Sequence, residues 1–433
     1  MSVTIQTTFN DVVALQEPLV VSASSNQTGN IGTTIFKFRY VLVLDIDGTE
    51  VITVKQQPNA NGYAHFDLHR ILESYLAATY EGGSDQIHVT DRCYNNNNGG
   101  IFVEIDISEE YSTSETTDPS NQGGNATASF IAINTVFQFS DGVVPTLAGV
   151  YEYNDDNTAL SWLSKMPTTL TTREGEYQTA GILISDFNGS TYPVDNNEVK
   201  MVLTYYEEDG TQINSYTIDY KTTLAGKNFV TTKNTTGGNK MIQFFPVGYQ
   251  NLEDAFSTQA PSNQSDLAYY TIYWYDSVAT GLGWRTKTYR FNLADCTKYT
   301  PIQLAWLNEL GCWDYYTFDL ASIEQLKIQR DSIRKQFGNW NAGADFTYSF
   351  YEGGERVTKI DADKEYTVNS DWLNDEEFIW LQSLLMSTDV LTPDENGNYV
   401  PVIITDNDYQ IKKTVNEKLN SLTVKFKLSH KIR

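Results

Sequence analysis

Hydrophobic and polar residues alternate with a period of two along much of the chain, which is the pattern of half-buried β-strands. Residues 35–56 show it most clearly, because two apolar runs flank Asp47-Gly48. Asp-Gly between alternating runs is typical of a tight hairpin, since glycine adopts positive φ without a Cβ clash. We therefore predict two antiparallel strands here. Next along the chain, the pattern predicts a helix at 66–78 and strands at 101–107 and 130–139.

The same order of elements recurs further along the chain. Residues 199–220 again predict strand, turn and strand, with Asp209-Gly210 at the turn. A short helix is expected next, and then two strands, at 247–256, 268–276 and 285–293. The recurrence predicts a duplicated domain, with the extra residues of the second copy inserted in a loop, where insertions are tolerated.

The last third of the chain has a different pattern. Asn374 and Glu377 have the spacing of a capping box, which predicts a helix over 374–387. The charged, weakly amphipathic segment 321–337 predicts another helix, and Gly353-Gly354 predicts the turn of a hairpin over 346–360. Further strands are predicted at 313–320, 399–406 and 408–429.

These patterns predict a mainly β, multi-domain protein. We expect tandem antiparallel β-sandwiches of the immunoglobulin or fibronectin kind with short helices, and a C-terminal α+β domain. The predicted domains are a β-sandwich, its duplicate and the α+β domain, at 1–148, 149–297 and 298–433.

Composition restricts the partners of the chain. There are 55 acidic and 30 basic residues, a formal charge of −25, so we expect no nucleic-acid partner, because such a surface repels phosphate. No run of about 18 apolar residues occurs, so we expect no membrane insertion, and the first residues do not resemble an export signal. Cys93, Cys296 and Cys312 are widely spaced, which predicts neither a disulfide framework nor a metal knuckle.

One segment resembles a catalytic motif. LVLDIDGTEV at 42–51 is similar to the nucleophile motif of haloacid-dehalogenase phosphotransferases, with Asp45 as nucleophile and Asp47 as acid/base. That fold needs a loop and a helix after the motif, whereas residues 51–55 predict a returning strand. The duplicate, YYEEDGTQ, keeps the turn but lacks the first aspartate. We therefore expect a structural turn.

Other candidate sites have similarly incomplete signals. His65 and His69 lie four apart, which would put them on one face of a helix as metal ligands, but they lack the glutamate of a zinc-protease motif. Paired oxygen ligands that calcium could use lack a full binding loop and are expected to be turns: Asp45/Asp47, Asp361/Asp363, Asp394/Asn396 and Asp406/Asp408. The aromatic run 269–276 suits either a glycan platform or a core strand. We expect no cofactor, no metal, no catalytic residue and no enzymatic activity.

Three segments together carry a family resemblance. They are QPNANGYAHFDLHRIL at 57–72, WLNELGCWDYYTF at 306–318 and EYTVNSDWLNDEEFIWLQSLLMSTDV at 365–390. Their aromatic and glycine positions resemble virion proteins of tailed bacteriophages, notably those that infect Bacteroidota, including the crAss-like group. The resemblance implies a tail, collar, hub or baseplate component that is made in the host cytoplasm, joins other virion proteins and has no catalytic residue.

The C-terminal residues suggest how copies could associate. Residues 412–433 hold one acidic residue, Glu417, and seven basic ones, which are the candidate interface residues Lys412, Lys413, Lys418, Lys425, Lys427, Lys431 and Arg433. A basic patch on an acidic chain permits head-to-tail contacts that close into a cyclic homo-oligomer. The same lysines would also protect an edge strand from aggregation. The alternative function is a carbohydrate-binding or adhesion module, such as a tail fibre or surface protein, with a host glycan as partner.

Overall fold

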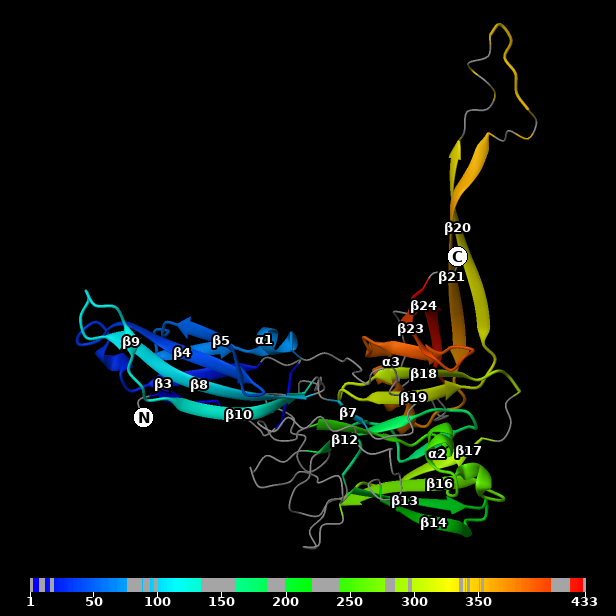
Figure 1. Ribbon diagram of the computed structural model, residues 1–433, viewed down its shortest axis with the longest axis horizontal. Coiled ribbons are helices and arrows are strands. Elements are labelled where there is room, and N and C mark those ends of the chain that lie inside the picture. Colours follow the sequence, from blue (N-terminus) through cyan, green and yellow to red (C-terminus); the bar gives the residue numbers. More distant parts are fainter. Residues whose placement is uncertain are drawn as a thin grey trace. The chain divides into compact units, whose positions relative to one another are not determined.

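The chain forms two compact units. One holds Met1–Asp295 with Leu307–Asp314, and the other holds Cys296–Trp306 with Tyr315–Arg433. The computed structural model describes residues 3–7, 12–15, 19–75, 88, 94–96, 100–133, 160–184, 199–219, 241–276, 285–294, 298–334, 338, 340, 343–349, 351, 354–405 and 421–430. The predicted mainly β, multi-domain class is confirmed (Figure 1).

The first sandwich begins with the predicted hairpin. β4 (Phe36–Ile46) and β5 (Thr49–Gln56) pair antiparallel around Asp47-Gly48, whose φ angles are 50° and 78°. Two positive φ angles define the hairpin turn whose twist matches that of the flanking strands. The hairpin belongs to a six-stranded sheet of order β2-β10-β8-β4-β5, with β9 beside β8. The other strands are β2 (Val12–Ala14), β8 (Gly100–Ser112), β9 (Ser120–Asn121) and β10 (Ala126–Ile133).

A three-stranded sheet provides the second layer of this sandwich. Its order is β1-β3-β6, and apolar residues of both sheets form one buried cluster. Its strands are β1 (Val3–Ile5), β3 (Val20–Ser25) and β6 (Tyr63–Asp67). The helix predicted over 66–78 starts later, because Phe66 and Asp67 belong to β6; α1 (His69–Glu73) follows, and residues 76–78 lie outside the described residues.

The second sandwich repeats this topology. Its five-stranded sheet has the order β11-β17-β16-β13-β14, and its edge pair β11–β17 is parallel, as β2–β10 is in the first sandwich. A short helix, α2, follows β15 as α1 follows β6. The elements are β11 (Thr169–Thr172), β12 (Thr179–Ile184), β13 (Val199–Tyr206), β14 (Gln212–Asp219), β15 (Met241–Pro246), α2 (Tyr249–Ala255), β16 (Tyr269–Asp276) and β17 (Tyr289–Leu293).

Aromatic side chains fill the core of the second sandwich. The Trp162 ring stacks on Tyr289 with 3.6 Å between ring centroids, and lies 5.0 Å from the ring of Trp274. Buried Asn251 of α2 ties the helix to its surroundings: its Oδ1 accepts from the Gln178 backbone N–H at 2.7 Å, and its Nδ2 donates to the carbonyl of His88. Burial lowers the pKa of His88 to about 3, so this imidazole is a neutral core group at neutral pH.

A strand from early in the chain joins the second sandwich. β7 (Tyr94–Asn96) pairs antiparallel with β15, so the second layer has the order β12-β15-β7. The range 1–148 therefore contributes a strand to the sandwich of 149–297. The boundary between residues 148 and 149 lies outside the described residues, and residue 297 ends another such segment.

The second unit is built on a seven-stranded sheet of order β19-β18-β22-β23-β24-β21-β20. The capping box of α3 (Asp375–Met386) is confirmed, with Asn374 and Glu377 exchanging hydrogen bonds. α3 packs on the sheet, where Trp306 Nε1 donates to Ser383 Oγ at 2.8 Å. No described helix has the length and apolar character needed to cross a membrane. The strands are β18 (Ile302–Leu307), β19 (Trp313–Phe318), β20 (Ile323–Arg334), β21 (Glu355–Asn369), β22 (Val390–Pro393), β23 (Tyr399–Ile404) and β24 (Thr423–Leu428).

Two predictions for this unit are wrong. Residues 323–334 form strand β20 and not a helix, and β20 pairs along its length with β21. The hairpin predicted over 346–360 is not the pairing found among the described residues, because residues 355–360 belong to β21, which pairs with β20 over residues 355–367. Hydrogen bonds and cross-strand side-chain contacts with β21 therefore outweigh the helix propensity of this charged segment.

Gly48→Val should destabilise the first sandwich by about 1–2 kcal/mol, because Gly48 has φ 78° and a β-branched residue is strained there. Chemical denaturation of both proteins at the same pH measures the loss. Gly48→Asn is the matched control, since asparagine tolerates this conformation. Equal losses for valine and asparagine would contradict the backbone explanation.

Candidate functional site

The motif of Asp45 and Asp47 resembles a catalytic site in sequence, but in the structure it is a hairpin turn that is hydrogen-bonded to β8. The Asp47 backbone N–H donates to the Phe102 carbonyl at 2.9 Å, and its Oδ1 accepts from the Phe102 backbone N–H at 3.1 Å. Burial raises the pKa of Asp47, while the hydrogen bond from Phe102 acts in the opposite direction. Asp45 lies in β4 opposite Glu50, and the following strand returns directly. The two aspartates thus join the turn to β8.

The two histidines do not share a helix face, so that hypothesis is wrong. His65 lies in strand β6, where its Nδ1 is 2.8 Å from Ser22 Oγ, whereas His69 is the first residue of α1. The Nδ1 atom of His69 contacts the carbonyl of Leu15. Each imidazole is therefore part of the local packing of its own element.

The candidate calcium ligands lie at separate places. Asp394 closes the turn between β22 and β23, where it accepts from the backbone N–H groups of Asn396 and Asn398, each at 2.8 Å, and these bonds lower its pKa. Asp361 pairs with Lys359 on β21. Residues 406 and 408 lie outside the described residues. Across the described ranges, no three His, Cys, Asp or Glu side chains gather as a metal site.

The aromatic run of β16 divides between core and surface, as strand alternation requires. Tyr270, Ile272 and Trp274 are fully buried. An arginine lies over the ring of each of two outward tyrosines. The Arg290 guanidinium is 3.5 Å from the ring centroid of Tyr269, and the Arg285 guanidinium is 4.1 Å from the ring centroid of Tyr273. Each arginine covers one face of its tyrosine ring, so that face is not open to a sugar.

Two of the seven predicted interface residues are described. Lys425 and Lys427 lie on β24, which pairs with both β21 and β23, so the edge-strand interpretation of these lysines is wrong. Lys427 lies opposite Glu365, on the polar face of the sheet. The other five lie outside the described residues: Lys412, Lys413, Lys418, Lys431 and Arg433.

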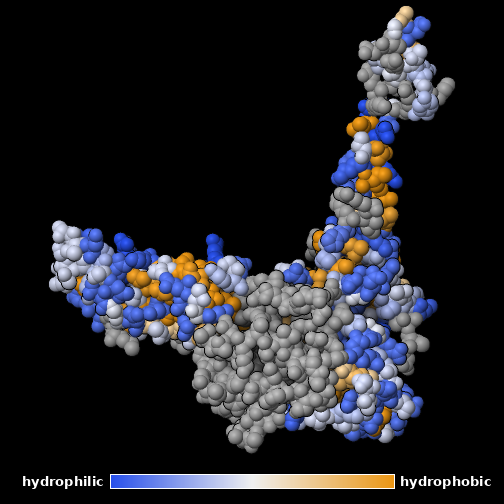
Figure 2. All heavy atoms as spheres, in the orientation of Figure 1, coloured by the Kyte–Doolittle hydropathy of each residue, from blue (hydrophilic) through white to orange (hydrophobic). Residues whose placement is uncertain are grey.

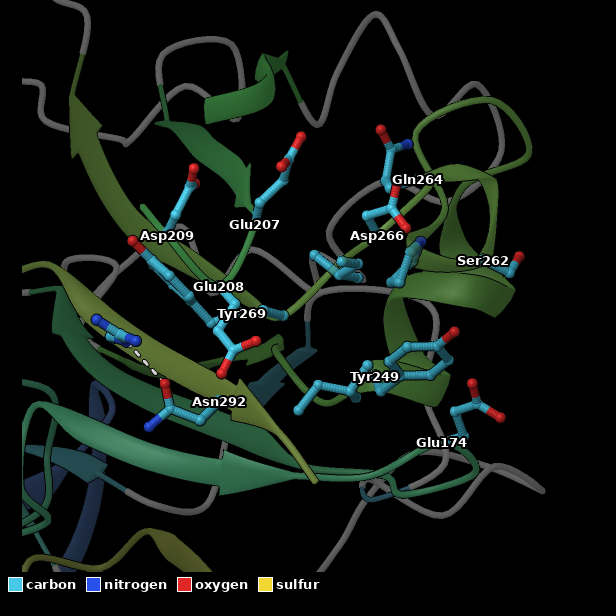
Figure 3. A pocket seen from close by; sticks show the side chains of 15 residues that line it. Glu174, Glu207, Glu208, Asp209, Tyr249, Ser262, Gln264, Asp266, Tyr269 and Asn292 are labelled. Atoms are coloured by element: carbon cyan, nitrogen blue, oxygen red, sulfur yellow. Dashed lines mark hydrogen bonds between the residues drawn. The ribbon is translucent and has the colours of Figure 1, made fainter. Parts of the chain in front are cut away.

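An open acidic pocket lies on the second sandwich (Figure 3). Its volume is about 1090 Å³, and carboxylates from three segments line it, at Glu174, Glu207, Glu208, Asp209 and Asp266. The turn at 207–211 supplies most of them, and the Thr211 backbone N–H lowers the pKa of Asp209. Burial, followed by the nearby Glu253 and Glu174, raises the pKa of Tyr249 to about 12.

The positive charge in this pocket is already engaged. Arg290 stacks on Tyr269, and its Nε donates to Asn292 Oδ1 at 2.7 Å. The other charged side chains of the lining are all acidic, which favours cationic groups or hydroxyls over anions. This arrangement offers hydrogen-bond acceptors. Ser262, which also lines the pocket, donates its hydroxyl to Glu253 Oε2 at 2.8 Å.

A second candidate surface is the arm, defined as residues 323–334 of β20 and 355–364 of β21. Figure 1 shows this hairpin extending beyond the rest of its sheet. Directly paired residues share a face, so register places Leu326, Ile328, Ile360, Ala362 and Val357 on one side, the apolar arm face. The same face also holds polar residues, among them Glu324, Arg330, Ser332 and Lys364. Leu326 and Ile360 are 56% and 55% exposed, and Figure 2 shows hydrophobic residues gathered along the arm.

The opposite side of the arm is polar along its centre, with the exposed Ile323 and Ile333 at its two ends. Lys327 pairs with Glu365 at 2.6 Å, and Lys359 pairs with Asp361 at 2.5 Å. These cross-strand and along-strand pairs neutralise charge within the hairpin. The centres of the two faces therefore differ, with aliphatic side chains on one and ion pairs on the other.

The apolar arm face continues the core face of the second unit. Tyr366 lies opposite Phe426 of β24, its ring stacked at 5.2 Å, and Phe426 is fully buried. Alternation along β21 puts Ala362 and Ile360 on the same side as Tyr366. The face that α3 covers over the sheet thus runs on along the arm with its side chains exposed.

Sequence analysis missed the arm because two periodicities compete there. Ile323, Leu326 and Ile333 fit a helix, whereas Leu326 and Ile328 fit a strand. The pattern that indicates a strand lies in the pairing partner, β21, where Tyr366, Ala362 and Ile360 alternate with charged residues. Pairing the two segments identifies the strand.

No family model matches the chain, and no curated protein matches it. Among solved structures, dimeric latent PorU from Porphyromonas gingivalis is 10% identical, with a TM-score of 0.14 over 68% of this chain and 20% of that one. The plexin A4 full extracellular region is 8% identical, with a TM-score of 0.17 over 98% of this chain and 36% of that one. The chain therefore spans between a fifth and about a third of the length of these structures.

Asp47→Asn should leave the chain at least as stable as the original at pH 7. Asparagine tolerates positive φ and still accepts from Phe102, but it removes a carboxylate whose pKa is raised by burial. A raised carboxyl pKa means that Asp47 itself favours folding below its folded pKa and loses that contribution as pH rises through it. Urea unfolding at pH 3.5 and 7 measures the difference.

The variant should therefore gain relative to the original as pH rises. Asp47→Ala is the matched control, which loses the acceptor and costs about 1–2 kcal/mol at both pH values. A larger loss for asparagine than for alanine at pH 7 would contradict this role.

Proposed function

We propose that the chain is a structural component of a tailed-phage virion, in the tail, collar, hub or baseplate, that acts by protein–protein assembly without catalysis. The observation that supports this most directly is the apolar arm face. Leu326, Ile328, Ile360 and Val357 are each at least 43% exposed, although they continue a core face. Such a surface is costly in water and marks a contact with another protein.

The architecture of the arm supports the same proposal. A two-stranded hairpin without a packed face is marginally stable in water. The arm is therefore suited to become ordered and buried when another protein covers it. The family resemblance of residues 306–318 and 365–390 supplies the particular context, a virion assembled in the host cytoplasm from this chain and other virion proteins.

Multiple copies fit this role. Virion parts are built from repeated subunits, and a cyclic homo-oligomer with residues 412–433 at a contact remains our proposal for the ring. Lys425 and Lys427 lie on the polar face of the sheet, away from the apolar arm face. The basic segment and the arm would therefore make different contacts.

Substituting the apolar arm face should block assembly while the chain still folds. Leu326→Asp with Ile328→Asp removes the apolar surface at two exposed positions, so the fold needs neither side chain. We expect incorporation into particles, measured by mass spectrometry of purified virions, to fall at least about tenfold, because two buried apolar anchors are lost. Gln325→Asp with Gln329→Asp on the polar face is the matched control and should incorporate normally.

Immunogold labelling locates the chain within the particle. Labelling at one tail, collar or baseplate position is expected. A chain that appears only in the particle-free fraction, or an arm variant that incorporates like the control, would contradict the proposal.

A glycan-binding adhesion module is the second candidate, and the exposed aromatics beyond the arm favour it. Trp340 and Tyr351 are 68% and 89% exposed, and aromatic rings of this kind stack on sugars. Glycan-array binding by the full chain that falls at least about tenfold in Trp340→Ala with Tyr351→Ala is the expected result if this candidate holds. Tyr63→Ala, at an exposed tyrosine of the first sandwich, is the control. An array without hits would remove the candidate.

A further inference from the structure

We infer that the apolar arm face is covered by the apolar arm face of a second copy of this chain, packed face to face about a twofold axis with the two arms antiparallel. This inference rests on the proposed assembly function and names the partner of the arm. It is carried by the distribution of charge at the two ends of the apolar arm face.

Each end of the apolar arm face carries one acid and one base, on opposite strands. At the end nearer the sheet, Glu324 lies on β20 and Lys364 on β21, and their side chains pair at 2.7 Å. At the far end the order is reversed. There, Arg334 lies on β20 directly opposite Glu355 of β21.

This reversal makes the face complementary to itself. A twofold axis across the arms places β20 over β20 of the second copy and exchanges the two ends. Glu324 then faces Arg334 of the second copy, and Lys364 faces Glu355 of the second copy. Each pair is attractive and occurs twice, so four charge contacts frame the apolar centre.

The apolar centre suits the same arrangement. Ile328 and Ile360 lie near the axis, between the charged ends, and two sheet faces pack about 10 Å apart when such side chains interdigitate. Arg330 is the one charged residue in the centre. Its aliphatic stem would lie on Ile328 of the second copy, while its guanidinium reaches the rim.

The cover of the sheet selects the antiparallel orientation. In a parallel pair the end charges would also attract, because Glu324 would face Lys364 of the second copy. However, α3 packs on the face of the sheet that the apolar arm face continues, so parallel arms would bring two α3 helices together at one end and hold the faces apart. Antiparallel arms place the two helices at opposite ends of the pair.

The size of the contact predicts its strength. A strand of 12 residues is about 40 Å long, so two faces of two strands each bury roughly 800 Å² in total. Stable, specific interfaces bury at least about 1,200 Å². The arm contact alone should therefore be weak, and it would become firm where other contacts hold the copies together, as in a particle.

The test uses the full-length chain and sedimentation equilibrium over about 1 µM to 1 mM, a range that covers weak dimers. The informative variant is Glu324→Lys with Lys364→Glu. It preserves the ion pair within the arm but turns all four contacts between antiparallel arms from attraction to repulsion. We expect its dimer dissociation constant to rise at least about tenfold.

The matched control inverts the equivalent pair on the polar side, Lys327→Glu with Glu365→Lys. That pair has nearly the same geometry, 2.6 Å against 2.7 Å, and lies on the same two strands. It should change the dissociation constant by less than about twofold, since it faces away from the contact. Far-UV circular dichroism verifies that both variants are folded.

Mixing two variants provides a rescue. Arg334→Glu with Glu355→Arg is repulsive to itself, but in the antiparallel dimer it restores every contact to the chain that carries Glu324→Lys and Lys364→Glu. We expect heterodimers in the mixture with the affinity of the original chain. A parallel dimer would not be rescued in this way.

Three results would overturn the inference: a monomeric original chain up to 1 mM, no effect of the first variant, or no rescue in the mixture. None of these bears on whether the chain is in the virion, which mass spectrometry of particles decides separately. A chain found in particles with its arm on another protein would overturn the arm pairing and keep the proposed function. If the chain is absent from particles but dimerises as described, the proposed function is overturned and the arm pairing is kept.

Discussion

An apolar sheet face has to be covered, and this constraint organises the whole protein. In each of the two sandwiches a three-stranded sheet covers the larger sheet, and side chains of both layers form one buried cluster. In the second unit α3 provides the cover, with Trp306 hydrogen-bonded to Ser383 beneath it. Among the described residues, the arm continues the same kind of face with its side chains exposed.

The acidic pocket and the arm differ in the kind of side chain that they expose. The pocket gathers carboxylates around Tyr249 and Tyr269, and its Arg290 is already stacked on Tyr269 and hydrogen-bonded to Asn292. The arm is incomplete in the isolated chain, because its side chains resemble those of a core. An incomplete face favours an assembly component over a protein that works alone.

The duplicated topology shows which features of a repeat persist. Both sandwiches keep the strand order, the parallel edge pair and the helix after the equivalent strand. Their hairpins differ: Asp47 and Gly48 form a two-residue turn, whereas Glu207 bonds to Thr211 across a longer turn. The turn residues that looked catalytic in one copy are thus part of a connection that each copy builds in its own way, which agrees with the structural role of Asp47.

Local signals in the sequence were sufficient for elements that depend on neighbouring residues. Asp47-Gly48 predicted its hairpin because positive φ is a property of the turn itself, and Asn374 with Glu377 predicted α3 because a capping box joins residues three apart. The two alternatives for the aromatic run of β16 are separated by strand alternation, which buries Tyr270, Ile272 and Trp274 and leaves Tyr269 and Tyr273 outside the core. Only the tertiary structure decided that residues 323–334 are a strand, since their partner begins after residue 354 and helical and strand periods both fit. It also placed His65 and His69 on different elements and β24 inside a sheet, because strand pairing is a long-range contact that no local pattern encodes.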